Sequence, residues 1–330
     1  MRTTSLPPIL ATIPRSGTWF LRYVVSFLVQ LDRGGRIDNR VTGRIVGDPA
    51  GTPFDFPQFK GGPLFYVRGT LPTDHLFVGH TVCPGFPDTL STHSWWHRTS
   101  FHVRGYDYLH EGLDYDFTPV DLAPHCNTPL PVPALERAAR KGRGPRIALV
   151  YRNPVDQAAS YYWYCQNHKD AAYRFLAGHS LSGMPFDHYL FGFALPSYAK
   201  QFISYQMMSV RYPSLVRLFS YEALMRDPLR GVTAILDHLA GKSCARPALA
   251  DAVWLAERDH LKAVERELGR SLDGSRPDRV GHMRHPIKRA TDSRWDATTL
   301  ERTTSALAGL GVDTTLFEWP VVEQRAASAA

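Results

Sequence analysis

The sequence has few cysteines, and their spacings give them no evident structural or metal-binding role. The chain of 330 residues contains four cysteines, at positions 83, 126, 165 and 244. No two of them form a CxxC pair, and no cysteine–histidine group has zinc-finger spacing. We interpret them as reduced thiols, the state expected in the cytoplasm. A cytoplasmic protein without a metal site is therefore predicted.

Long apolar runs and blocks of like charge are also missing. The stretch Phe20 to Leu31 is apolar, but Arg22 interrupts it, it is too short to span a bilayer, and it lacks a small-residue cleavage site. The formal net charge of +7 is spread along the chain instead of forming one basic run. This distribution disfavours a nucleic-acid-binding arm. We expect no membrane anchor and no nucleic-acid partner.

Apolar patterning predicts an α/β fold class, with a parallel β-sheet flanked by helices on both faces. Hydrophobic residues make up 44% of the chain, which is enough for a core. We expect one domain over 1–325, an acceptor-site insertion or lid at about 81–144, and a frayed tail over 326–330. Short apolar runs predict strands at 9–13, 75–80, 146–151 and 215–221. Helical spacing of apolar residues predicts helices at 20–31, after 151, and at 186–211, 222–240 and 246–269. Residues 43–63, rich in Gly and Pro, are expected to be irregular.

The loop Pro14-Arg15-Ser16-Gly17-Thr18 joins the first predicted strand to the first predicted helix. A strand-to-helix turn directs backbone N–H groups at one point, and the helix dipole adds positive potential there. Gly17 allows close approach of an anion, Ser16 and Thr18 offer hydroxyl donors, and Arg15 adds a fixed charge. The pattern GxxxxGK[ST] is absent from this loop, which disfavours a nucleoside-triphosphate hydrolase.

A second block, Tyr151-Arg152-Asn153-Pro154-Val155-Asp156, leads from the third strand towards Ser160. Asn153 is suited to cap a helix and Pro154 to its first position. Ser160 lies about two helical turns beyond Asn153 and so returns to the same face. Arg152 and Ser160 are therefore candidates to hold one anionic group.

Two more blocks complete the pattern: Tyr221-Glu222 with Asp227-Pro228, and Lys288-Arg289-Ala290 with Trp295. The four blocks, in this order, resemble the family of sulfotransferases that use 3′-phosphoadenosine 5′-phosphosulfate (PAPS). They are similar to its PKSGTTW, RNPxDxxxS, YExMxxDP and RKGxxGxW motifs. The resemblance implies a P-loop-like sulfotransferase fold, PAPS as co-substrate, 3′-phosphoadenosine 5′-phosphate (PAP) as product, and no metal.

The resemblance also implies residue roles. Arg15 would replace a lysine at the bridging oxygen of the leaving phosphosulfate, and Arg152 and Ser160 would bind the 3′-phosphate. Ser16, Gly17 and Thr18 would cradle the 5′-phosphate. Trp19 and Phe20 would continue the cofactor-binding segment, with Phe20 at an adenine-stacking position, and Tyr221 would sit at the adenine. Lys288 and Arg289 would close over the 3′-phosphate. Trp19 stands where the family has a threonine, and Ala290 where it has a glycine. The segment 256–259 lacks the Ser-Phe pair with which many members touch the adenosine.

A general base is expected at the end of the second strand. His80 follows Leu76-Phe77-Val78-Gly79, which resembles the family's strand ending in Lys-Thr-His-x-Pro, and a histidine suits proton removal near neutral pH. Glu111 is the rival, because some relatives use a glutamate. The His/Trp-rich segment 93–102 is interpreted as an aromatic wall or lid over the acceptor instead of a metal site.

Several alternatives stay open at this stage. A nucleotide-dependent kinase, or a phosphoadenosine-nucleotide-binding protein without catalysis, would also use these anion sites. The expected partner is a small-molecule acceptor in an aromatic-lined pocket. A phenol, an alcohol, a sugar or a natural-product scaffold would fit, and both a monomer and a homodimer are compatible with the sequence.

Overall fold

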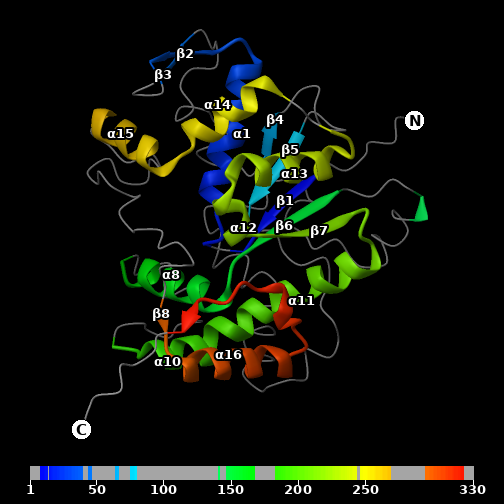
Figure 1. Cartoon of the computed structure of the whole chain (residues 1–330), viewed down its shortest axis with the longest axis vertical. Coiled ribbons are helices and arrows are strands. Elements are labelled where there is room, and N and C mark those ends of the chain that lie inside the picture. The colour runs from blue at the N-terminus through cyan, green and yellow to red at the C-terminus, as the bar shows by residue number, and fades with distance from the viewer. Residues whose placement is uncertain are drawn as a thin grey trace, which may run out of the picture.

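A five-stranded sheet lies at the centre of the protein (Figure 1). The computed structural model describes residues 8–13, 15–39, 44–46, 64–66, 75–79, 140–141, 146–167, 183–243, 246–268 and 294–322. The strands, in spatial order, are β4 (Leu64–Tyr66), β5 (His75–Gly79), β1 (Ile9–Thr12), β6 (Ile147–Tyr151) and β7 (Val216–Ser220). The last four are mutually parallel, as predicted, so their carboxyl ends share one edge. The edge strand β4 is antiparallel to β5, which the sequence pattern did not indicate.

Helices cover both faces of the sheet, which confirms the predicted α/β class (Figure 1). One layer contains α1 (Thr18–Asp32), α12 (Tyr221–Arg226), α13 (Pro228–Ala240) and α14 (Pro247–Leu255), with α15 (Arg258–Leu268) following α14. The other contains α8 (Pro154–Asn167), α10 (Phe186–Tyr189), a π-helical turn (Leu190–Ala194), α11 (Leu195–Arg211) and α16 (Ala297–Gly309).

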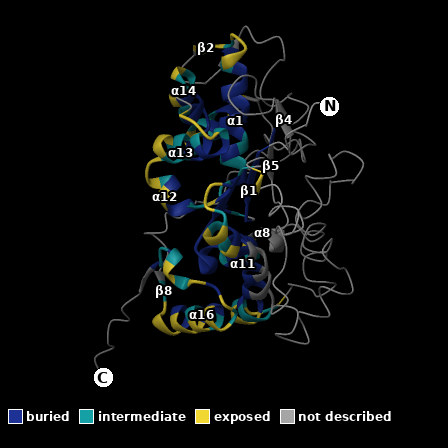
Figure 2. Ribbon diagram, turned by 90° about the vertical axis from the view of Figure 1, so that its right-hand side faces the viewer, coloured by how far each residue is buried: buried dark blue, intermediate teal, exposed yellow. Residues whose placement is uncertain are grey.

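Alternation along the central strands produces the two cores. Ile9 and Ala11 of β1 join the cluster beneath α8 and α11, whereas Leu10 points to the cluster beneath α1 and α13. Successive strand side chains point to opposite faces, so a strand covered on both faces is apolar throughout. Figure 2 shows the result: β1 is buried between the two helical layers, and exposed residues lie on the outer sides of helices such as α13 and α16.

Smaller elements complete the described structure. They are the antiparallel pair β2 (Arg36–Asn39) and β3 (Arg44–Val46), the parallel pair β8 (Arg294–Trp295) and β9 (Val321–Val322), and a 3-10 turn (Thr314–Leu316). Strand β3 lies inside the stretch 43–63 that we expected to be irregular, so that expectation was wrong there. Among the described residues, none of the helices has the length and apolar character needed to cross a bilayer.

The predicted helix over 222–240 is two helices, because Asp227 interrupts it. The Asp227 carboxylate accepts a hydrogen bond from the Arg230 N–H at 3.1 Å, and Pro228 occupies the first position of α13. A side-chain cap followed by proline starts a new helix. The chain therefore turns at Asp227, and α12 remains a short helix directly after β7.

Candidate functional site

The loop after β1 has a strained backbone. Arg15 adopts φ 66°, the left-handed region that residues with a Cβ seldom occupy. The Ser16 N–H donates to the Ile13 carbonyl at 3.1 Å, which closes a tight turn before α1. The Ser16 side chain is fully buried, and its Oγ has no hydrogen-bond partner among the described residues. An unpaired buried hydroxyl is costly and marks a place where a polar ligand would fit.

Helix α1 begins at this loop without a side-chain cap. Gly17 is its N-cap residue, at φ 87°, and makes no side-chain cap to the first N–H groups. These N–H groups have no partner within the helix, and the helix dipole adds positive potential to them. Thr18 begins the helix, and its hydroxyl lies 2.6 Å from the Thr12 hydroxyl at the end of β1. The start of α1 therefore has the form of an anion cradle.

Gly17 also touches the third sequence block. A Cβ built on Gly17 would lie 3.0 Å from both Cδ2 and Cε2 of Tyr221. Tyr221 is the first residue of α12, and only 6% of its surface is exposed. The contact joins the loops after β1 and β7. Glycine is thus required here by its positive φ and by the neighbouring ring.

A hydrogen bond joins the first block to the second. Arg15 Nε donates to Ser160 Oγ at 3.1 Å across 145 residues of chain. The serine hydroxyl is the acceptor in this bond, so its own proton can be donated to another group. The sequence predicted Ser160 beside Arg152, and the hydrogen bond that the structure shows for Ser160 is to Arg15.

Helix α8 starts as the sequence predicted, with Asn153 as its cap. The Asn153 Oδ1 accepts from the Val155 N–H at 3.0 Å, and Pro154 is the first helical residue. Arg152, immediately before the cap, is 7% exposed. Its carbonyl accepts the Tyr198 hydroxyl at 2.7 Å, which fixes the backbone of the turn. Its Nε is buried without a partner within the described ranges.

Positive charge gathers around Tyr221. The Arg152 guanidinium lies over the Tyr221 ring, 5.1 Å from its centroid. Burial raises the pKa of the Tyr221 phenol, and Glu222 raises it further, while Arg152, Arg15 and Arg258 lower it. Three guanidinium groups and one carboxylate therefore act on this hydroxyl. Of these arginines, Arg152 is buried and lies over the ring, and a buried positive charge favours an anionic ligand.

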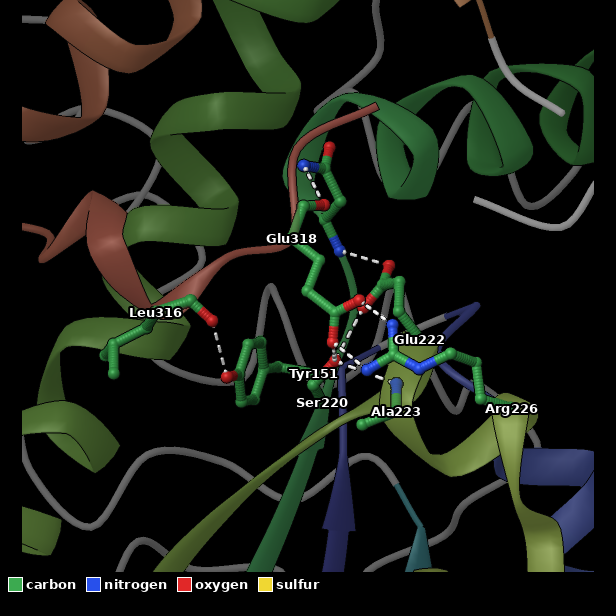
Figure 3. A network of polar contacts seen from close by, with 8 residues as sticks. Tyr151, Ser220, Glu222, Ala223, Arg226, Leu316 and Glu318 are labelled. Atoms are coloured by element: carbon green, nitrogen blue, oxygen red, sulfur yellow. Dashed lines mark hydrogen bonds and ion pairs between the residues drawn. The ribbon is translucent and has the colours of Figure 1, made fainter. Parts of the chain in front are cut away.

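Figure 3 shows the polar network that holds the ends of β6 and β7 together. Glu222 accepts the Asn153 N–H at 2.8 Å and the Ser220 hydroxyl at 3.0 Å. Burial raises the pKa of this carboxyl group, while these hydrogen bonds lower it. Glu318 forms an ion pair with Arg226, and its carbonyl accepts Asn153 Nδ2 at 3.1 Å. The C-terminal segment is thereby tied to the turn that carries Arg152.

Nearby, Tyr151 anchors the same segment from β6 (Figure 3). Its hydroxyl donates to the Leu316 carbonyl at 2.7 Å. Burial, followed by the nearby charges of Glu222, Glu318 and Asp313, raises the pKa of Tyr151 to about 12. The phenol therefore remains a hydrogen-bond donor at every physiological pH.

The fourth block reaches the second through its tryptophan. Trp295 Nε1 donates to Asp156 Oδ1 at 2.9 Å, and its ring stacks on Phe186 at 5.4 Å between centroids. Asp156 lies in the first turn of α8, where a carboxylate also favours the helix N-terminus. The structure adds a tertiary role, because Asp156 holds the end of the fourth block against α8.

The structure thus brings together part of the predicted site. Its members within the described residues are Arg15, Ser16, Gly17, Thr18, Arg152, Ser160 and Tyr221, with Trp19 and Phe20 half-buried against the α1-side core. The candidates His80, Glu111, Lys288 and Arg289, the segment 93–102 and the tail 326–330 lie outside the described residues. So does the predicted insertion 81–144, apart from residues 140–141. Sequence reasoning did not predict the hydrogen bond between Arg15 and Ser160.

A search for a metal centre gives no candidate in the part of the chain that the structure describes. No group of three or more His, Cys, Asp or Glu side chains is placed there to hold a metal ion. The polar groups that converge on the sheet edge are instead arginines, hydroxyls and backbone N–H groups. Such groups donate hydrogen bonds to anions.

Comparison with known proteins finds distant structural similarity. No protein-family model and no curated protein matches the sequence. Among solved structures, the chain is similar to mouse sulfotransferase SULT7A1 complexed with PAP, at 14% identity over 95% of this chain and 86% of that chain, with a TM-score of 0.45.

It is also similar to retinol dehydratase in two complexes. The complex with androsterone and the inactive cofactor PAP is 16% identical, covers 95% of this chain and 83% of that chain, and has a TM-score of 0.39. For the complex with retinol and PAP, the identity is 16%, the match covers 96% of this chain and 84% of that chain, and the TM-score is 0.37. These similarities are distant, and the function proposed next rests on this chain's own residues.

Proposed function

We propose that this protein is a sulfotransferase, which transfers a sulfuryl group from PAPS to a hydroxyl or other nucleophile of a small-molecule acceptor. The observation that carries the proposal is the hydrogen bond from Arg15 to Ser160, which joins two loops whose sequences both resemble anion-binding motifs. Gly17, in the first of these loops, packs against Tyr221 of the third. Three sequence blocks therefore converge at the carboxyl edge of β1, β6 and β7, where parallel sheets bind ligands.

The residues at this edge fit a nucleotide that carries phosphates at both ends of its ribose. Ser16 Oγ and Arg152 Nε are buried without partners among the described residues, and they belong to separate loops. Because Gly17 has no side chain, an anion can approach the start of α1. The N–H groups of the first helical turn can then donate hydrogen bonds to it. The bound PAPS would supply an activated sulfuryl group and a stable phosphate leaving group.

The chain's own residues would position and stabilise charge. Arg15 stays protonated at all relevant pH values, so it acts by electrostatics and cannot donate a proton to the leaving group. It also orients Ser160, which accepts from Arg15 Nε and can donate its own proton to a phosphate oxygen. Arg152 and Ser160 would hold the 3′-phosphate, and Ser16, Gly17 and Thr18 the 5′-phosphate. Lys288 and Arg289 remain sequence predictions for the 3′-phosphate.

His80 would serve as the general base that removes the acceptor proton. The residue before it, Gly79, ends β5 and pairs with Ala11 of β1. Arg15 follows Ala11 by four positions, so β5 and the anion loop leave the same edge of the sheet. This register supports His80 as the base, with Glu111 as the rival that the sequence offers.

The nucleotide part of the proposal is tested by calorimetric titration of the purified chain with PAP, ATP and AMP. We expect PAP to bind tightest by at least about tenfold, because only PAP offers a phosphate to each of the two anion loops. Arg152→Gln should remove most of that preference. Equal affinity for the three nucleotides would contradict the proposal, and a preference for ATP would favour a kinase.

The catalytic part is tested with PAPS and a panel of phenols and alcohols, with release of PAP as the readout. Once an acceptor is found, His80→Ala should bind PAP as the wild type does and lose turnover by about 100-fold or more. Glu111→Gln is the matched variant and should retain turnover. A reversal of these two results would assign the base to Glu111.

A further inference from the structure

The peptide group between Arg152 and Asn153 is held at both of its polar atoms. Its carbonyl oxygen accepts the Tyr198 hydroxyl at 2.7 Å, and its N–H donates to Glu222 Oε1 at 2.8 Å. Tyr198 belongs to α11 and Glu222 to α12, and these helices lie on opposite faces of the sheet. This one peptide group is therefore fixed between the two helical layers.

The two hydrogen bonds determine where the Arg152 side chain starts. A peptide group is planar, so bonds at its oxygen and at its nitrogen fix the orientation of the plane and of the Arg152 Cα that borders it. The side chain is 7% exposed and its guanidinium lies 5.1 Å from the centroid of the Tyr221 ring. Because a long side chain pivots at its Cα, a rotated peptide group would displace the guanidinium from this position.

Tyr198 is itself rigidly held. It is 3% exposed, and its ring packs on Phe202 at 5.7 Å and on Phe317 at 5.9 Å between centroids. Burial raises the pKa of the Tyr198 phenol well above its ordinary value, and Glu222 and Tyr151 raise it further. The phenol is therefore a fixed hydrogen-bond donor to the Arg152 carbonyl.

A π-helical turn sets the direction of Tyr198. Helix α10, the π-helical turn Leu190–Ala194 and α11 follow one another without a break, and Tyr198 lies in the first turn of α11. A π-helical turn spaces its hydrogen bonds by five residues instead of four, so it rotates later side chains by roughly 100° relative to an uninterrupted α-helix. Such a rotation is large enough to take the Tyr198 hydroxyl away from Arg152.

We propose that Tyr198 is a positioning residue of the nucleotide site, whose hydroxyl holds Arg152 where its guanidinium can bind a phosphate of the nucleotide. The inference rests on the proposed function, because it takes Arg152 as a residue that binds PAPS and PAP. Tyr198 lies outside the four sequence blocks, so the family resemblance gives it no role. It acts through Arg152 and needs no contact of its own with the ligand.

The test is a double-mutant cycle, measured by calorimetric titration with PAP at low salt so that weakened variants still bind. The four proteins are the wild type, Tyr198→Phe, Arg152→Gln and the double variant. Tyr198→Phe removes only the hydroxyl and keeps the ring. Tyr162→Phe is the matched control, because the Tyr162 hydroxyl also donates to a backbone carbonyl, that of Met184 at 2.6 Å. Thermal unfolding of each variant shows that it is folded and measures its loss of stability.

We expect Tyr198→Phe to weaken PAP binding by about three- to tenfold, as the loss of a hydrogen bond that orients a charged group should. In the Arg152→Gln background the same change should cost at most about twofold, because the arginine that Tyr198 positions is gone. Tyr162→Phe should bind PAP like the wild type despite a similar loss of stability.

Three results would overturn the inference and leave the proposed function standing. They are wild-type affinity in Tyr198→Phe, equal losses from Tyr198→Phe in the two backgrounds, and an equal loss of affinity in Tyr162→Phe. Absence of PAP binding by the wild type would overturn both the inference and the proposed function.

Discussion

Gly17 and Tyr221 lie in contact, so that a Cβ on Gly17 would be 3.0 Å from two carbons of the tyrosine ring. The contact couples the start of α1 to the start of α12. Tyr221 is almost fully buried and has Arg152 over its ring. The ring therefore has little room to withdraw, and the shape of the anion loop depends on a side chain more than 200 residues away in sequence.

Gly17→Ala should accordingly destabilise the protein more than its backbone strain explains. The matched control is Gly34→Ala, because Gly34 has a similar φ of 91° and its added Cβ would meet nothing within 4 Å. We expect about 1–2 kcal/mol for Gly34→Ala, from the left-handed backbone alone. Gly17→Ala should cost at least about 1 kcal/mol more, through overpacking. Urea unfolding measures both, and equal losses would show that the ring contact is unimportant.

Removal of the Glu222 carboxylate should be strongly destabilising. Glu222→Ala leaves the buried Asn153 N–H and the Ser220 hydroxyl without their acceptor, which should cost about 2–4 kcal/mol. Arg226→Ala serves for comparison, because it breaks an exposed ion pair with Glu318 and should cost at most about 1 kcal/mol. Urea unfolding that ranked the two variants in the reverse order would contradict this account of the network.

His238 should make the protein less stable in mild acid. Its Nε2 lies 3.1 Å from the Ile147 carbonyl. Burial lowers its pKa from the ordinary value of 6.5, the backbone hydrogen bonds at Ile147 and Leu215 raise it by less, and Arg146 and Arg217 lower it slightly. The unfolded chain therefore binds a proton near pH 6.5 that the folded chain does not. This contribution to stability is present above pH 6.5 and is lost as the pH falls through the lowered folded pKa.

The measurement is the free energy of unfolding from about pH 5 to about pH 7.5, in wild type and in His238→Gln. The variant has no titrating group at this position, so its stability should fall less steeply with acid. The other histidines are common to both proteins and cancel in the difference. Parallel curves would mean that His238 does not contribute to the pH dependence.

Ser160→Ala should weaken PAP binding modestly while leaving the fold intact. The variant loses the hydroxyl that Arg15 orients, and we expect a loss of about three- to tenfold. Ser209→Ala is the control, because Ser209 also lies on a helix, α11, but donates to its own helix at the Gln206 carbonyl. If both variants bind PAP like the wild type, the Arg15–Ser160 pair is not part of the nucleotide site.

Local features of the fold could be predicted because local interactions produce them. The apolar runs of β1 and β6 are strands buried on both faces, and Asn153 caps α8 through side-chain bonds to the next residues. The short antiparallel strand β4 gave no comparable pattern, because three residues do not establish an alternation. Likewise, nothing in the sequence distinguishes the π-helical turn Leu190–Ala194 from the α-helix on either side.

The candidate site was predictable as motifs but not as contacts. The Arg15–Ser160 hydrogen bond arises because β1 and β6 are neighbours in the sheet, an order that the sequence does not state. The Trp295–Asp156 bond and the position of the Arg152 guanidinium over the Tyr221 ring are likewise set by tertiary packing.

The most direct test of the central claim is a crystal structure of the chain with PAP. We expect one phosphate at the start of α1, within hydrogen-bonding distance of Ser16 Oγ and the first N–H groups of the helix. We expect the other phosphate at Arg152 and Ser160. A PAP molecule bound elsewhere, with Ser16 Oγ and Arg152 Nε still without ligand contacts, would contradict it.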